Sequence, residues 1–130
     1  MPVNSKQKGA RYERELAVYF RDRGYDTRRT AQYCGNTGDA ADVIGLPYIH
    51  VEAKHQEQLR LYDWIAQAVR DSAGTGRLPA VFHRKNKETT LVSMRLDDWM
   101  TLYKAYEGCR AAEKYIVDNY CKAEKERGTE

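Results

Sequence analysis

The segment ADVIGLPYIHVEAK, residues 41–54, decides the fold of this chain. Its first five residues have the composition of a short strand, which a proline then interrupts. A second strand is expected over residues 48–54, whose alternate positions Ile49, Val51 and Ala53 share one face. The connection between the two is short enough for a hairpin. Two paired strands are therefore predicted at the centre of the fold.

Three side chains of this hairpin have the chemistry of a metal site. Side chains two apart on a strand point to the same face, so Glu52 and Lys54 stand side by side, opposite in direction to Val51 and Ala53. If the strands pair, Asp42 can lie beside them on that face. Two converging carboxylates hold Mg²⁺ or Mn²⁺, because hard cations prefer oxygen ligands, and the Ala53 carbonyl is the obvious backbone ligand.

A metal ion held there would lower the pKa of a bound water and stabilise negative charge on a phosphate. Lys54 would orient the attacking water or counter the charge of the transition state. These are the parts that phosphodiester hydrolysis needs. The ordinary alternative is a surface ion pair between Glu52 and Lys54, since Glu-x-Lys occurs by chance in many strands. The residues alone leave both interpretations open.

The remaining sequence is expected to alternate helices and strands. Helices are predicted over residues 9–23 and 59–72 and from Asp97 onward, where Gly108 would divide the last segment. Further strands are predicted over residues 25–32, 78–83 and 89–94. The predicted buried stripe of the second helix consists of Leu59, Tyr62, Ile65, Ala66 and Val69. The order predicts an α/β fold, with helices covering both faces of one central mixed sheet of about five strands.

Length and composition indicate one domain. The 130 residues leave room for one hydrophobic core, which we place in residues 1–96, with a helical extension over residues 97–130 packed on the same domain. No apolar run approaches the roughly 18 residues that a membrane span needs, and no apolar signal segment opens the chain. We therefore expect a cytoplasmic protein without a membrane partner.

Charge and cysteine content are weaker guides. The net charge is only +3, but basic residues crowd the first thirty positions. Such a run is compatible with a nucleic acid backbone as partner, although basic runs are often only solvated helix faces. The cysteines are odd in number and lack a CxxC pair, which predicts free thiols rather than disulfides or zinc ligands. They are Cys34, Cys109 and Cys121.

Four motifs follow one another in chain order: KGARYEREL over residues 8–16, a glycine-rich turn over residues 34–39, then ADVI and VEAK. Together they resemble the archaeal-type Holliday junction resolvases and their phage relatives, which belong to the PD-(D/E)XK nuclease superfamily. The resemblance extends from about Lys8 to Ser93 and implies a restriction-endonuclease-like core. Ala41 replaces the proline of the superfamily name, and the turn lacks the serine common in the resolvases, which puts DNA contacts of that loop in doubt.

The resemblance implies a role for each matching residue. Asp42 and Glu52 would be the core metal ligands, and Lys54 the catalytic lysine. Glu13 would be the helix-borne acid, a direct or water-mediated metal ligand. Helical geometry alone does not choose between Glu13 and Glu15, because both flank the apolar stripe equally. The resemblance favours Glu13; the alternative for either is an acid that complements the helix dipole.

Further residues are candidates for the same site. Gln67 on the second helix would reach it, as glutamines on the equivalent helix do in related nucleases, unless it is an ordinary surface residue. We predict DNA contacts from four basic residues, whose alternative is a solvated surface. They are Lys8, Arg11, Arg84 and Lys85.

Four residues near the site are given structural interpretations instead. His50 and His55 flank the central strand and are interpreted as polar filler. Tyr62 and Trp64 are interpreted as core residues rather than platforms for stacked bases.

The resemblance and the hairpin together predict a metal-dependent endonuclease that hydrolyses DNA, with Mg²⁺ or Mn²⁺ as cofactor. Branched DNA is the expected substrate and a bacterial or phage-infected cell the expected setting. Symmetric cutting of a junction would need a homodimer, for which Tyr106, Tyr115 and Tyr120 could supply an interface. One alternative is a nuclease for flap, nicked or single-stranded DNA in repair or restriction. Another is a DNA-binding module without catalysis, which clustered carboxylates beside phosphate argue against.

Overall fold

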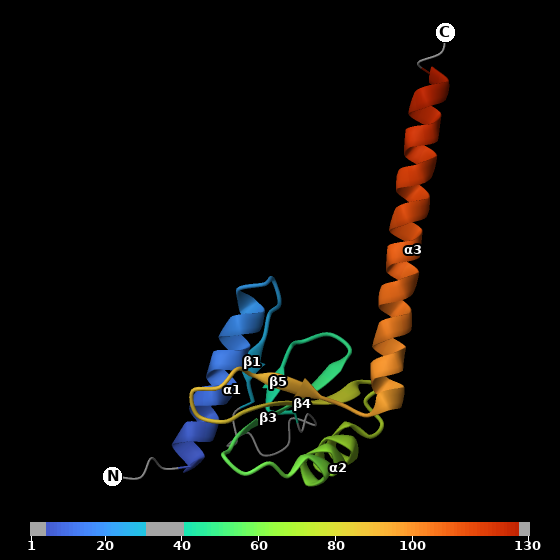
Figure 1. Ribbon diagram of the computed structural model, residues 1–130. Coiled ribbons are helices and arrows are strands. Elements are labelled where there is room, and N and C mark those ends of the chain that lie inside the picture. The colour runs from blue at the N-terminus through green and yellow to red at the C-terminus, as the bar shows by residue number, and fades with distance from the viewer. Residues whose placement is uncertain (1–4, 31–40, 128–130) are drawn as a thin grey trace. The chain divides into compact units, whose positions relative to one another are not determined.

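The computed structural model describes residues 5–30 and 41–127. It divides into two compact units, Met1–Arg95 and Leu96–Glu130, each of which is described by itself. The predicted order of one helix, three strands, one helix, two strands and one helix is confirmed (Figure 1). The elements are α1 (Ser5–Arg21), β1 (Arg28–Arg29), β2 (Val43–Ile44), β3 (Ile49–His55), α2 (Leu61–Ser72), β4 (Leu78–Arg84), β5 (Leu91–Ser93) and α3 (Leu96–Arg127).

The strands form one five-stranded mixed sheet in the order β1-β2-β3-β4-β5. The predicted hairpin is confirmed, because β2 pairs antiparallel with β3 through Val43 opposite Val51. β3 and β4 run parallel along their whole length, and α2 connects them as the crossover helix. The strand expected over residues 25–32 is much shorter than predicted, but β1 does lie at an edge of the sheet.

A close backbone approach fixes the start of the hairpin. Gly45 has a φ of +99°, which side-chain-bearing residues rarely adopt. A Cβ atom at Gly45 would also lie 2.0 Å from the carbonyl oxygen of Asp26. The neighbouring Thr27 is buried and donates a hydrogen bond from its hydroxyl to the carbonyl of Ala17, at 2.7 Å. Gly45 therefore allows the β2–β3 turn to pack against the segment that leads into β1.

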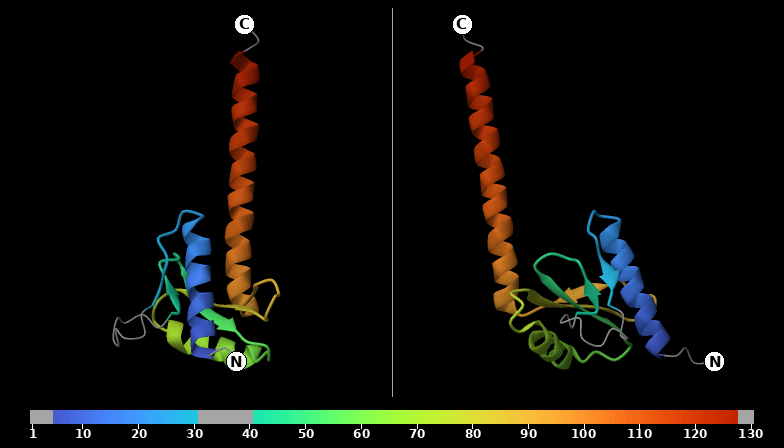
Figure 2. Two further views of the ribbon diagram at one scale, coloured as in Figure 1. Left: turned by 90° about the vertical axis from the view of Figure 1, so that its left-hand side faces the viewer. Right: turned by 180° about the vertical axis from the view of Figure 1, so that it is seen from behind.

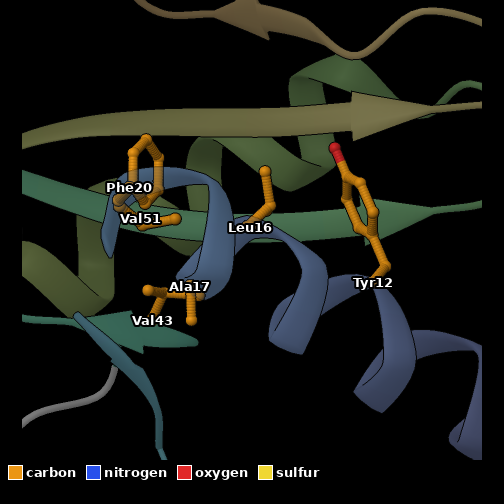
Figure 3. Close-up of a cluster of buried hydrophobic side chains, with 6 residues drawn as sticks. All are labelled: Tyr12, Leu16, Ala17, Phe20, Val43 and Val51. Carbon is orange, nitrogen blue, oxygen red and sulfur yellow. The ribbon is translucent and has the colours of Figure 1, made fainter. Parts of the chain in front are cut away.

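The α1 side of the sheet holds the larger hydrophobic core. Leu16 and Phe20 of α1 pack toward Val43 and Val51 of the hairpin (Figure 3). Phe20 also meets the ring of Phe82 edge-on, with centroids 5.6 Å apart. Since Val51 faces α1, strand alternation turns its neighbours in β3 toward the opposite face, under α2. Figure 2 shows α1 and α2 separated by the sheet.

The buried face of α2 differs from the predicted stripe. Trp64 and Ala68 pack against Val81 of β4, with Ile65 partly buried beside them. Tyr62 is 93% exposed, so its interpretation as a core residue is wrong, whereas that of Trp64 is confirmed. Leu59 and Ala66 of the predicted stripe are exposed as well. Several apolar residues compete for the interior in this helix, and the face that contains the large indole buries the most surface.

The described part of the second unit is one uninterrupted helix, α3. The predicted division at Gly108 is wrong, because one glycine costs a helix interior only about 1 kcal/mol. Cys109 and Cys121 are free, as predicted, and both are exposed; Cys34 lies outside the described residues. None of the helices in the described part of the chain combines the length and apolar character needed to cross a bilayer.

Candidate active site

The hairpin brings two carboxyl groups together. Asp42 directly precedes Val43, whose partner on β3 is Val51, and the Asp42 carboxyl group lies beside that of Glu52. The backbone N–H of Asp42 donates to the carbonyl of Val51 at 2.9 Å, and the N–H of Ala53 donates to Oδ2 of Asp42 at 2.8 Å. Two hydrogen bonds thus fix Asp42 against β3, although it precedes the first residue of β2.

Burial of these two acids disfavours negative charge on Asp42. The Glu52 side chain is only 1% exposed, and its Oε2 atom has no hydrogen-bond partner among the residues that the structure describes. The pKa of Asp42 is raised to about 8, first because burial disfavours its charged form and next because the Glu52 carboxylate lies beside it. Asp42 is therefore protonated at neutral pH unless a cation lies beside it.

Lys54 completes the set on the same face of β3. Its Nζ atom lies 3.6 Å from Oε1 of Glu52 and donates a hydrogen bond to Oε1 of Gln67 at 3.1 Å. Gln67 belongs to α2, which covers this face of the sheet. The lysine is thus held between an acid of its own strand and an amide of the covering helix.

The two glutamates of the Glu-Arg-Glu run have different surroundings. Glu13 is buried and accepts a 2.5 Å hydrogen bond from Nε of Arg29 in β1. The Glu15 side chain is 48% exposed and forms a 3.1 Å ion pair with Arg84. Only Glu13 lies beside the hairpin acids, and its charge adds to the elevation of the Asp42 pKa.

These residues line one cavity of about 700 Å³, here called the acidic cleft. It brings together seven of the residues predicted for the site: Lys8, Glu13, Asp42, Glu52, Ala53, Lys54 and Gln67. Lys8 stands within 3.8 Å of Glu57, a further member of the lining.

Three predicted DNA contacts are not among the lining residues of the acidic cleft that the structure describes. Arg11 and Lys85 are exposed. Arg84 pairs with Glu15, lies over the ring of Tyr12 at 5.3 Å and lines a second cavity of about 440 Å³. These three would have to meet DNA outside the cleft.

A comparison with known protein families identifies the family of the chain. The family model described as "Phage putative PDDEXK endonuclease" matches residues 4–129, nearly the whole chain. The chain belongs to this family. It is a nuclease of the PD-(D/E)XK type, as the sequence resemblance implied.

The solved structure of another protein is similar in fold to this PD-(D/E)XK nuclease. It is the structure of Archaeoglobus fulgidus Hjc, a Holliday junction resolvase from an archaeal hyperthermophile. The match has a TM-score of 0.50 and 24% sequence identity, and covers 65% of this chain and 70% of that chain. The predicted restriction-endonuclease-like core is thereby confirmed. No curated protein gives a significant match to the chain.

The donor set of the nuclease fits a hard divalent cation. Asp42 and Glu52 supply carboxylate oxygens, and the Ala53 carbonyl is the backbone oxygen between them in sequence. Burial and the adjacent Glu52 carboxylate both raise the pKa of Asp42, so each of them penalises negative charge on this acid. A divalent cation would remove both penalties.

Sequence reasoning missed two residues that the nuclease places beside its acids. Arg29 was only part of a polar edge strand, yet it is the ion-pair partner of Glu13. His50 was interpreted as filler, but its Nε2 atom lies 3.7 Å from Oε2 of Glu52. The alternation that put Glu52 and Lys54 on one face applies equally to His50, so that signal was present in the sequence.

Proposed function

We propose that this chain is a metal-dependent endodeoxyribonuclease that uses Mg²⁺ or Mn²⁺. Asp42, Glu52 and the Ala53 carbonyl would hold the cation, and Lys54 would act on the phosphate or the attacking water. The single observation that supports this most is the proximity of the Asp42 and Glu52 carboxyl groups in a buried setting, which raises the pKa of Asp42 to about 8.

Each side chain has a distinct part in this proposal. A bound cation would supply a water of lowered pKa and stabilise charge on the phosphate. Lys54 donates hydrogen bonds to the reacting oxygens, and Gln67 holds its ammonium group in place. Glu13 adds an outer ligand, and Arg29 keeps that carboxylate oriented. Gln67 and Arg29 thus orient the reacting side chains, while the cation and Lys54 would compensate negative charge on the phosphate.

The proposed partner is DNA, contacted by Lys8 at the acidic cleft and by Arg11, Arg84 and Lys85 around it. Branched DNA is the substrate that we favour, because the sequence motifs resemble those of Holliday junction resolvases and the solved structure of similar fold is that of such a resolvase. A homodimer is part of that proposal, since paired nicks on a junction need two active sites. Flap, nicked or single-stranded DNA is the alternative.

Plasmid nicking tests the chemistry. Supercoiled plasmid should be nicked with Mg²⁺ or Mn²⁺ and left intact with EDTA. Asp42→Asn, Glu52→Gln and Lys54→Ala should each lower the rate by at least about a hundredfold while DNA affinity is largely retained. Wild-type nicking by Glu52→Gln would show that the site is wrongly assigned. DNA binding without any metal-dependent nicking would favour the non-catalytic binding module.

A matched pair of variants tests the helix-borne acid. Glu13→Gln should slow nicking far more than Glu15→Gln, because only Glu13 lines the acidic cleft. The reverse ranking would exchange the two roles.

Defined DNA substrates test the finer proposal. A synthetic four-way junction should receive paired symmetric nicks under conditions that leave linear duplex intact. Faster cleavage of flaps or nicked duplex than of the junction would support the alternative substrate class.

A further inference from the structure

A second group of metal-ligating side chains lies next to the acidic pair, between β3 and α2. His50 and Glu52 share the same face of β3, and Asp71 comes from α2. Asp71 follows Gln67 by four residues and therefore projects from the same side of the helix. One ligand atom from each of His50, Glu52 and Asp71 lies within 4.8 Å of the other two.

Two atoms of this group are buried and have no hydrogen-bond partner in the described part of the chain. Nε2 of His50 and Oε2 of Glu52 face each other at 3.7 Å, beyond normal hydrogen-bond distance. Both side chains are 1% exposed, and within residues 5–30 and 41–127 neither atom has a hydrogen-bond partner. Buried polar atoms are nearly always satisfied in folded proteins, so a vacant donor and acceptor position side by side requires an explanation.

We propose that His50, Glu52 and Asp71 bind a second divalent cation, a transition metal of the Zn²⁺ type. An imidazole nitrogen with two carboxylates suits such a metal better than it suits Mg²⁺, which prefers oxygen ligands alone. Three protein ligands leave one tetrahedral position for water. The half-buried Asp71 provides the side from which metal and water can reach the other two ligands.

Glu52 is the link between this site and the acidic cleft. Its Oε1 atom faces Lys54 at 3.6 Å, while Oε2 faces His50. A cation bound by Oε2 would fix the carboxylate that, on the proposed function, also serves the catalytic metal. Only this sharing of Glu52 rests on the proposed function; the second site itself rests on the three ligands and their unpartnered atoms.

Zn²⁺ binding to the full chain tests the site without measuring cleavage. The protein is freed of metal with EDTA and its cysteines are alkylated, because thiolates also bind Zn²⁺. Calorimetric titration should then show one Zn²⁺ per chain. Asp71→Asn and His50→Gln should each weaken the affinity by at least about tenfold, since even changes in groups outside the ligand set have effects of that size. Asp63→Asn, an exposed acid on the same helix, is the matched control and should bind normally.

A thermal readout covers the case in which a variant folds poorly. Zn²⁺ should raise the melting temperature of the wild-type protein and of Asp63→Asn, but not that of Asp71→Asn. If His50→Gln does not fold, Asp71→Asn decides the question, because its side chain is only half-buried.

Three results would overturn the proposal. They are the absence of Zn²⁺ binding, affinity that is unchanged in Asp71→Asn, and binding that is lost only in Asp42→Asn. The first would mean that His50 and Glu52 face each other without a bound metal, and the last that the metal occupies the acidic cleft. Because no DNA is cleaved in these experiments, a failure of the proposed nuclease function would not alter their outcome.

Discussion

Replacement of Asp42 by asparagine should stabilise the metal-free protein in a pH-dependent way. Burial and the adjacent Glu52 carboxylate raise the pKa of Asp42 from 3.8 to about 8, so the fold favours the protonated acid. A group whose pKa is higher in the folded chain stabilises the fold below its unfolded pKa and loses that contribution as pH rises to the folded value. Asparagine mimics the protonated acid at every pH, so Asp42→Asn should escape this loss.

The size of the effect follows from the pKa. One pH unit corresponds to about 1.4 kcal/mol for a single titrating group, so an increase from about pH 5 to about pH 8 can cost at most about 4 kcal/mol. Partial access of water to the acidic cleft lowers this penalty. We therefore expect about 2 kcal/mol, a substantial part of the stability of a domain of this size.

Urea unfolding of both EDTA-treated proteins across this pH range measures the difference directly. His55 and His83, whose pKa values burial lowers, titrate in the same range, but their contribution is common to both proteins and cancels. Addition of Mg²⁺ at pH 8 should bring the wild-type protein back toward the variant, because a cation replaces the missing proton. A constant difference between the two proteins from pH 5 to pH 8 would refute the electrostatic reasoning.

Three further changes test other parts of the structure by urea unfolding. Trp64→Ala should lower the free energy of unfolding by about 3–5 kcal/mol, and Tyr62→Ala by no more than about 0.5 kcal/mol; equal effects would contradict the assigned face of α2. Gly45→Ala should cost about 2 kcal/mol or more, because its φ and the carbonyl beside it exclude a Cβ atom, so a silent substitution would argue against this turn. Arg29→Gln should cost the metal-free protein about 1–3 kcal/mol by leaving the buried Glu13 carboxylate without its donor, and an unchanged midpoint would show that the pair is solvated.

The sequence predicted the centre of the fold well because its signals there are local. Alternation over residues 49–54 and the glycine and proline between the two strands specify a hairpin, and the hairpin brings Asp42 beside Glu52 without any information from distant segments. Each of these steps depends on residues that are near one another in the chain.

Features that depend on tertiary competition were predicted less well. α2 carries apolar residues on several sides, and only contact with Val81 of β4 decides that Trp64 is buried while Tyr62 is exposed. The ion-pair partner of Glu13 is Arg29, which lies sixteen residues later in the chain, on β1. No periodicity in a single segment reports such a pairing, because it arises when α1 and β1 pack together.

The position of Glu52 explains why one residue can matter both for stability and for chemistry. β3 is paired on both sides, and α1 and α2 lie on its two faces, so any polar side chain near its middle is removed from water. Val51 is part of the hydrophobic core. Nε2 of His50 and Oε2 of Glu52, by contrast, lie under α2 without a hydrogen-bond partner among the described residues. A strand in this place would be more stable with apolar residues at both positions. Retaining His50 and Glu52 therefore lowers the stability of the metal-free fold. This loss is consistent with bound cations being the partners of these two side chains.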